Sequence, residues 1–244
     1  MTWHHPDGTS RRPPVFNAPR AVVWLAGTLL LVHLLKVLAF GDRLILSLAF
    51  IPARFSAAAD AAQGVFVGGA LSKWTSLVTH VFLHGGWWHL LFNSVWLLIF
   101  GTPVAARLGT ARFLTLFLLA GIAGAATHGV LSWVGDAFTG GPRGPEILVG
   151  ASGAISGLMG AAARFIVLGR EMAVAGYDRP LLPLNDNQVV TFTVLWVVIN
   201  LVLALTGGLG MGMGDGISWE AHLGGYFAGL FLIPFIDSKG RAWR

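Results

Sequence analysis

The chain has 244 residues, of which 55% are hydrophobic and only 11% are charged; 16 Lys and Arg against 11 Asp and Glu leave a net charge of +5. An average soluble domain has about 25% charged residues, so this chain has too few charges to cover a soluble surface. Its apolar content excludes a disordered chain. Cysteine is absent, which excludes disulfides, thiolate metal sites and a cysteine nucleophile. A polytopic helical membrane protein remains.

Six apolar segments have the length and composition to cross a bilayer, or nearly so. A membrane-spanning helix needs about 20 mostly apolar residues. The runs are too continuous for the strands of an outer-membrane barrel, which alternate at period two. The fourth run is short, and we expect it to start inside the membrane from the Gly- and Pro-rich loop 135–150. The predicted fold is an all-α polytopic bundle of six transmembrane helices, at residues 21–40, 88–108, 112–133, 151–168, 189–206 and 219–236.

The positions of Lys and Arg indicate the orientation of the bundle. With the N-terminus in the cytoplasm, eleven cations lie in inner segments and four in outer loops, as the positive-inside rule requires. Lys36, near the outer end of the first span, is expected to snorkel to the interface. The long, weakly charged loop after it is expected to lie in the membrane interface.

These features predict a cytoplasmic tail at 1–20, a membrane domain at 21–237 and a second cytoplasmic tail at 238–244. The first span is expected to stay uncleaved, because it contains Lys36 and lacks an A-x-A cleavage site. No internal repeat of the kind that builds many transporters is visible.

Ser152 stands between glycines at the start of the fourth span, in the motif Gly150-Ala151-Ser152-Gly153. Glycines allow a sharp turn and close approach of a substrate, and the free N–H groups of a first helical turn can bind an oxyanion. The pattern is typical of a nucleophilic serine. By itself it is more often a helix-packing face, because Gly153, Gly157 and Gly160 lie on one side of the helix.

His222 lies in the apolar sixth span. Polar side chains inside a membrane are expensive to keep and usually mark function. Gly225 and Gly229 share its helical face and would let that face pack closely on a neighbouring helix, with the imidazole directed into the contact. A buried histidine that serves packing alone is the alternative interpretation.

A third polar group, at the start of the second span, consists of His80, His84, His89 and Asn93. His89 and Asn93 are four residues apart and project from the same helical face. Histidines at this spacing can chelate zinc, but the chain has no H-E-x-x-H pattern and no evident third ligand. We therefore predict neither a metal site nor a cofactor. The alternative to a functional role is a cluster of histidines that caps the helix or lies in the membrane interface.

Together these places supply a nucleophile, a base and two neutral hydrogen-bond donors on three different spans, which is the set that acyl transfer needs. At these residues the sequence resembles the rhomboid family of intramembrane serine proteases. The resemblance covers about residues 73–237. It rests on His84-x4-His89-x3-Asn93, on Gly150-Ala151-Ser152-Gly153 and on Ala221-His222-Leu223-Gly224-Gly225-x3-Gly229.

The resemblance implies a Ser–His dyad, with Ser152 as nucleophile and His222 as general base. It implies oxyanion stabilisation or substrate binding by His89, Asn93, Gly150 and Gly153. His80 and His84 would line a water route or support the site, and Gly157, Gly225 and Gly229 would serve helix packing.

Two positions depart from the family pattern. The family often shows Trp-Arg in the first loop, where this chain has Lys73-Trp74, and often has Glu after the glycine that closes the second span, where this chain has Ala105. Both positions concern the anchoring of the first loop and stability more than chemistry.

The expected function is cleavage of transmembrane segments, with single-span or other membrane proteins as substrates, the lipid bilayer as surroundings and no nucleic acid. The expected location is a bacterial inner membrane, with both termini in the cytoplasm. Two other classes remain open: a catalytically inactive relative that binds membrane spans as an adaptor or chaperone, and a transporter or channel. The sequence indicates no oligomeric state.

Overall fold

The computed structural model describes residues 18–55, 69–139, 146–166, 180–206 and 218–238. Within these residues the chain is helical, and its one extended backbone pairing joins Phe50 to Leu148. The elements in chain order are α1 (Arg20–Leu35), η1 (Lys36–Phe40), α2 (Asp42–Leu48), η2 (Pro52–Phe55), α4 (Gly69–Thr79), η3 (His80–Phe82), α5 (Trp87–Trp96), η4 (Leu97–Gly101), α6 (Thr102–Leu108), α7 (Thr110–Thr139), α8 (Ser152–Ala163), α9 (Asn187–Leu205) and α10 (Trp219–Ile236).

In the part of the chain that the structure describes, four helical segments are long and apolar enough to cross a membrane: Arg20–Phe40, Trp87–Leu108, Thr110–Phe138 and Asn187–Leu205. They correspond to the first, second, third and fifth predicted spans, and they confirm a helical membrane bundle. The fourth predicted span contains the shorter apolar helix α8. The sixth coincides with α10, whose first turns hold Glu220 and His222. The total of six crossings stays a prediction.

Two predicted boundaries were wrong. We expected the third span to end at residue 133 and a loop to begin at 135, but α7 continues to Thr139. A glycine such as Gly135 costs a helix only about 1 kcal/mol, so it does not end one by itself. We also expected the fourth helix to reach residue 168, but α8 ends at Ala163, where the chain turns and the Arg164 guanidinium donates to the carbonyls of Leu182 and Leu230.

Helix α8 lies at the centre of the bundle, with Gly153–Ala163 buried throughout. A helix that is apolar on every side is one that others surround. Its glycines permit contact between backbones: a Cβ on Gly225 would overlap the carbonyl of Gly153, and one on Gly229 would overlap that of Gly157. Since α8 and α10 touch backbone to backbone here, their first turns are held at a defined separation.

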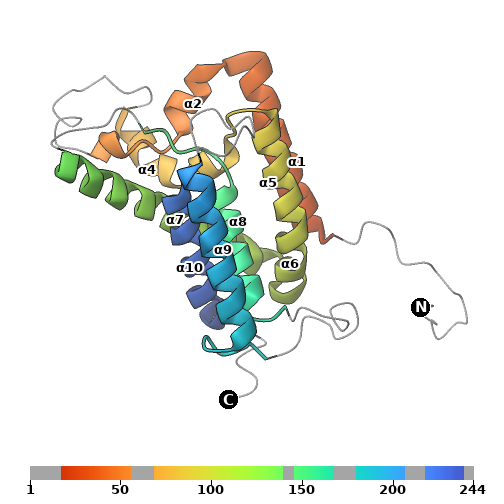
Figure 1. The fold of residues 1–244 in the computed structure, drawn as a ribbon. Coiled ribbons are helices and arrows are strands. Elements are labelled where there is room, and N and C mark those ends of the chain that lie inside the picture. Colours follow the sequence, from red (N-terminus) through yellow and green to blue (C-terminus); the bar gives the residue numbers. More distant parts are fainter. Residues whose placement is uncertain (1–17, 56–68, 140–145, 167–179, 207–217, 239–244) are drawn as a thin grey trace, which may run out of the picture.

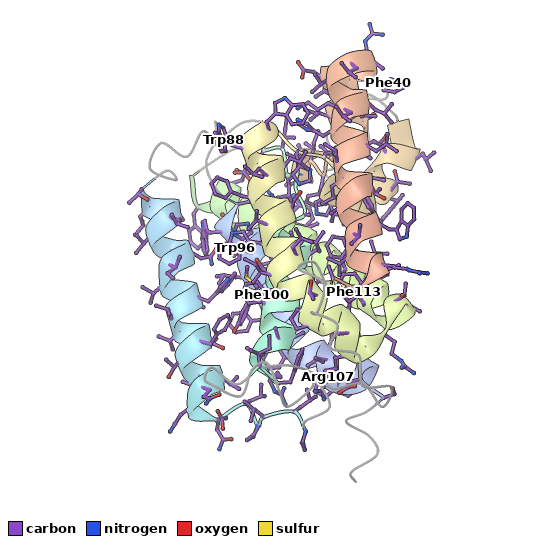
Figure 2. The ribbon with its side chains drawn as sticks, turned by 90° about the vertical axis from the view of Figure 1, so that its right-hand side faces the viewer. Phe40, Trp88, Trp96, Phe100, Arg107 and Phe113 are labelled. Carbon is purple, nitrogen blue, oxygen red and sulfur yellow. The ribbon has the colours of Figure 1, made fainter. Side chains whose placement is uncertain are left out.

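The short helices between α1 and α5 gather at one end of the bundle, and Figure 1 shows α2 and α4 in its upper part. In Figure 2, α5 stands between α1 and α9, with Phe40 at this end and Arg107 at the other. The part of the chain between α1 and α4 is attached to the bundle through buried residues. Arg54 donates to the carbonyl of Ala49 at 2.7 Å, and Phe50 exchanges backbone hydrogen bonds with Leu148. The predicted interfacial loop is thus packed on the bundle, while its stretch 57–62 lies outside the described residues.

At the opposite end a buried ion pair joins α6 to the end of α10. Arg107 Nε and Nη2 donate to Asp237 Oδ2 at 3.0 and 2.7 Å, and both side chains are almost fully buried. The guanidinium also lies 4.8 Å from the centre of the Phe165 ring. The ion pair therefore holds Asp237, the residue that follows α10, against α6 at the end of the second span.

We expect Arg107→Met to destabilise the protein strongly, because it leaves the Asp237 carboxylate buried without its main cation. Removing one partner of a buried ion pair typically costs about 3–5 kcal/mol. Thermal unfolding in detergent micelles measures the effect, and Arg112→Met, at an exposed arginine bonded to Ser238, is the matched control. Equal melting temperatures for the two variants would contradict the prediction.

Candidate active site

Ser152 is the first residue of α8 and is half-buried. The turn before it depends on Gly150, whose φ of 120° is a conformation that residues with a side chain rarely adopt. The Gly150 N–H donates to the carbonyl of His80 at 3.0 Å, which fixes the turn to the loop ahead of α5. Ser152 therefore stands where the N–H groups of the first helical turn have no partner within the helix.

Gly150 also has a steric reason to lack a side chain. A Cβ there would lie 2.7 Å from His89 Nε2 and 3.7 Å from Ser152 Oγ. The imidazole edge of His89 and the hydroxyl of Ser152 thus lie within 4 Å of one point. The structure brings these two predicted site residues together across 63 residues of sequence.

The hydrogen bonds of α5 orient His89 and Asn93. The Gly85 N–H points at His89 Nδ1 at 3.4 Å, which places the ring proton on Nε2, the nitrogen that faces Gly150. Asn93 is buried and donates one amide hydrogen to the His89 carbonyl at 2.8 Å. Its second N–H is available to another acceptor. Both residues can act as neutral donors.

His222 lies in the first turn of α10, opposite the start of α8. A Cβ on Gly153 would be 3.2 Å from the carbonyl oxygen of Ala221, so the residues next to Ser152 and to His222 are in contact. No hydrogen bond joins Ser152 to His222 among the described residues. Such bonds are often long in the absence of substrate and tighten only in the Michaelis complex.

His222 Nδ1 is instead 2.8 Å from Oδ1 of Asn200, on α9. Sequence analysis missed Asn200. The available signal was an amide in the middle of an apolar span, since polar groups in the membrane usually have a purpose. A carboxylate is the usual partner of such a base, and a neutral amide does not stand out in the same way.

His80 and His84 are buried next to the site and precede the span that begins at Trp87. His80 Nδ1 donates to the Ser76 carbonyl at 2.9 Å. The His84 ring packs edge-on against His89, with centroids 5.1 Å apart. Burial lowers the pKa of both imidazoles from their ordinary value, which keeps them neutral.

Lys36, which we expected to snorkel, contacts the backbone just before α5. Its Nζ donates to the carbonyls of His84 and Gly85 at 2.9 and 2.8 Å. These bonds satisfy two of the three N–H donors of the ammonium. Lys36, the first residue of η1, thereby ties the end of the first span to the turn that orients His89.

The two departures from the family pattern lie away from Ser152. The Trp74 ring meets Phe55 edge-on, with centroids 5.6 Å apart, and Lys73 Nζ lies 5.6 Å from the same ring centre. Phe55 in turn packs against Phe50. Ala105 is buried in the core of the bundle. Both positions belong to the packing of the loop and of the core.

The chain matches the family model of the Rhomboid domain over residues 71–239. It is 30% identical to the putative rhomboid protease YdcA of Bacillus subtilis, over 72% of this chain and 74% of that protein. It is 31% identical to the rhomboid protease GluP of the same organism, over 66% of this chain and 26% of that protein. It is 32% identical to the rhomboid protease GlpG of Serratia proteamaculans, over 68% of this chain and 49% of that protein. The chain belongs to the rhomboid family.

Proposed function

We propose that the protein is an intramembrane serine endopeptidase that cleaves transmembrane segments by a Ser152–His222 dyad. The observation that carries the proposal is the approach of three spans to the start of α8: Ser152 Oγ and His89 Nε2 lie within 4 Å of the position of a Gly150 Cβ, and Ala221, next to His222 on α10, contacts Gly153. Acyl transfer requires a nucleophile, a base and oxyanion donors at such a point.

In the proposed reaction His222 Nε2 takes the proton of Ser152 Oγ as the oxygen attacks the scissile carbonyl carbon. The C=O electron pair moves to the oxygen and gives a tetrahedral oxyanion. The C–N bond then breaks, and the imidazolium returns its proton to the leaving amine. Water repeats the sequence on the acyl-enzyme and releases Ser152.

The oxyanion would be stabilised by His89 Nε2–H, by an Asn93 amide hydrogen and by backbone N–H groups at Ser152 and Gly153. All are neutral donors at fixed positions, and in a site of low dielectric such donors lower the barrier more than they would in water. His80 and His84 would hold the surrounding loop, and the packing glycines would hold α8 against α10.

The proposed substrates are membrane proteins, single-span ones included, entering from the bilayer. A peptide bond inside a helix is shielded, so the substrate must unwind near the cut. Residues of low helix propensity at that place reduce the cost of unwinding. We therefore expect preference for segments with small or helix-breaking residues.

Two experiments test this proposal against a catalytically inactive, span-binding relative. Purified protein in liposomes is incubated with a panel of single-span substrates, beside the Ser152→Ala variant, and fragments are followed by mass spectrometry. A fluorophosphonate probe is applied to both proteins, because only an activated serine reacts with it. Cleavage and labelling by the wild type alone support the protease. Binding of spans with neither cleavage nor labelling would identify the inactive relative.

We also propose that the protein resides in a bacterial inner membrane with both termini in the cytoplasm. The support is the distribution of eleven inner and four outer cations. Activity reporters fused at the C-terminus and at Gly140 are expected to report opposite sides of the membrane. Reporters on the same side would mean an even number of crossings between them and would contradict the predicted three.

A further inference from the structure

Asn200 is a buried polar residue on α9, a helix that is otherwise mostly exposed. Val189 and Asn200 are the buried residues of α9, and the remainder of that helix is largely exposed on the outside of the bundle. A buried amide in an apolar setting is costly unless its hydrogen bonds are made. The bonds that Asn200 makes therefore explain why a polar group at this position is tolerated.

These bonds determine the orientation of the amide. Asn200 Nδ2 donates to the Trp196 carbonyl at 3.0 Å, and a carbonyl can only accept. The oxygen of the amide must then be the atom that faces His222, 2.8 Å from Nδ1. Since Oδ1 is also only an acceptor, Nδ1 must bear the proton. The lone pair is left on Nε2.

The segment of α9 that presents Asn200 is itself held to both catalytic helices. Trp196 Nε1 donates to Met159 Sδ of α8 at 3.2 Å. The Trp196 ring stacks on Tyr226 of α10, with centroids 4.4 Å apart and planes 16° from parallel. Figure 1 shows α9 alongside α8 and α10. Asn200 thus approaches His222 from a segment of α9 that is attached to both α8 and α10.

From this geometry we infer that Asn200 is a positioning residue for the general base: it holds His222 in the Nδ1–H tautomer and in one ring orientation, with Nε2 free to accept the Ser152 proton. The inference rests on the proposed dyad. It adds that the site operates as Ser152–His222–Asn200, with a neutral amide in the place that a carboxylate occupies in Ser–His–Asp proteases. When Nε2 takes the proton, the Nδ1–H···Oδ1 bond persists and becomes charge-assisted.

The first test compares Asn200→Leu with Thr193→Val. Leucine keeps most of the side-chain volume and removes the acceptor. Thr193 lies on the same helix and makes the other side-chain bond from α9 to α10, with Oγ1 2.8 Å from Tyr226 Oη. Loss of the outer hydrogen-bond partner of a metal-bound histidine typically costs about 10–100-fold in metal affinity or activity, and we expect a loss of this order for the metal-free His222. We expect kcat to fall by that factor in Asn200→Leu with KM nearly unchanged, and to change less than about twofold in Thr193→Val.

The second test is rescue. Asn200→Asp restores an acceptor at the same branch of the side chain, and in its protonated form it can also donate to Trp196. We expect kcat of this variant to return to within about tenfold of the wild type, as a retained Nδ1 partner would allow. Equal losses in the Leu and Asp variants, or equal losses in Asn200→Leu and Thr193→Val, would indicate a structural role only and overturn the inference.

A third readout does not depend on activity. In ¹⁵N-histidine-labelled protein carrying Ser152→Ala, the two ring nitrogens of His222, assigned by their loss in His222→Phe, report which one is protonated. We expect protonated Nδ1 and bare Nε2, and a mixture once Asn200→Leu is added. A bare Nδ1 in the presence of Asn200 refutes the inference whether or not the protein is a protease. Failure of the dyad is recognised separately, as cleavage by Ser152→Ala.

Discussion

Ser152→Ala and His222→Ala are each expected to abolish cleavage while leaving the bundle folded. Ser152 supplies the oxygen that forms the acyl-enzyme, and His222, in the first turn of α10, supplies the base. When either member of such a unit is removed from a serine protease, kcat falls by about 10⁶, and removing both costs little more. We therefore expect the double variant to be no slower than either single variant. Initial rates on a cleavable single-span substrate measure all three.

The matched control for Ser152→Ala is Ser156→Ala, one turn further along the same buried helix. Ser156 lies on the same helical face as Ser152, so the variant removes a neighbouring hydroxyl and keeps the proposed nucleophile. Its rate is therefore expected to stay within a few-fold of the wild type. Melting temperatures of all variants show that loss of activity is not loss of fold. Robust turnover by Ser152→Ala or by His222→Ala would falsify the assignment.

Asn93→Ala is expected to lower kcat by about 10²–10³, the usual cost of one oxyanion donor, with substrate affinity almost unchanged. The donor acts only once charge develops on the carbonyl oxygen, so it contributes to the transition state and not to binding. Slow labelling by a serine-directed probe is expected to persist, because Ser152 and His222 remain. Rates, KM and labelling measured on one preparation provide the test.

The competing explanation is that Asn93 only holds α5 to a neighbouring helix. The bond that its amide makes stays within α5, to the carbonyl of His89, which weakens that explanation. Interhelical side-chain bonds in membranes average about 0.6 kcal/mol, so a purely structural Asn93 predicts a slightly lower melting temperature with near-normal turnover. Asn93→Asp is the sharper variant. It keeps the size and removes the N–H donors, and a loss of kcat as large as that of the alanine variant supports the oxyanion role.

The sequence by itself determined the membrane-embedded, all-helical character of the chain, the positions of most spans and the family. Long apolar runs can exist only as helices in lipid, because every backbone N–H and C=O must be paired inside the segment. The pairing of Ser152 with His222 was also proposed from sequence, since polar groups on apolar spans stand out against their background. The sequence also predicted that His89 and Asn93 share one face of α5, because residues four apart in a helix lie on the same side.

Only the tertiary structure decided the contacts between elements that are distant in the chain. The end of α7 at Thr139, the binding of Lys36 to the carbonyls before α5 and the reach of Asn200 to His222 have no local signature. A glycine, a lysine and an asparagine each have several acceptable environments, and the choice among them depends on which partners the packing brings within hydrogen-bond distance. The backbone contact of α8 with α10 sets those distances around Ser152, because glycines on both helices leave no side chain between them.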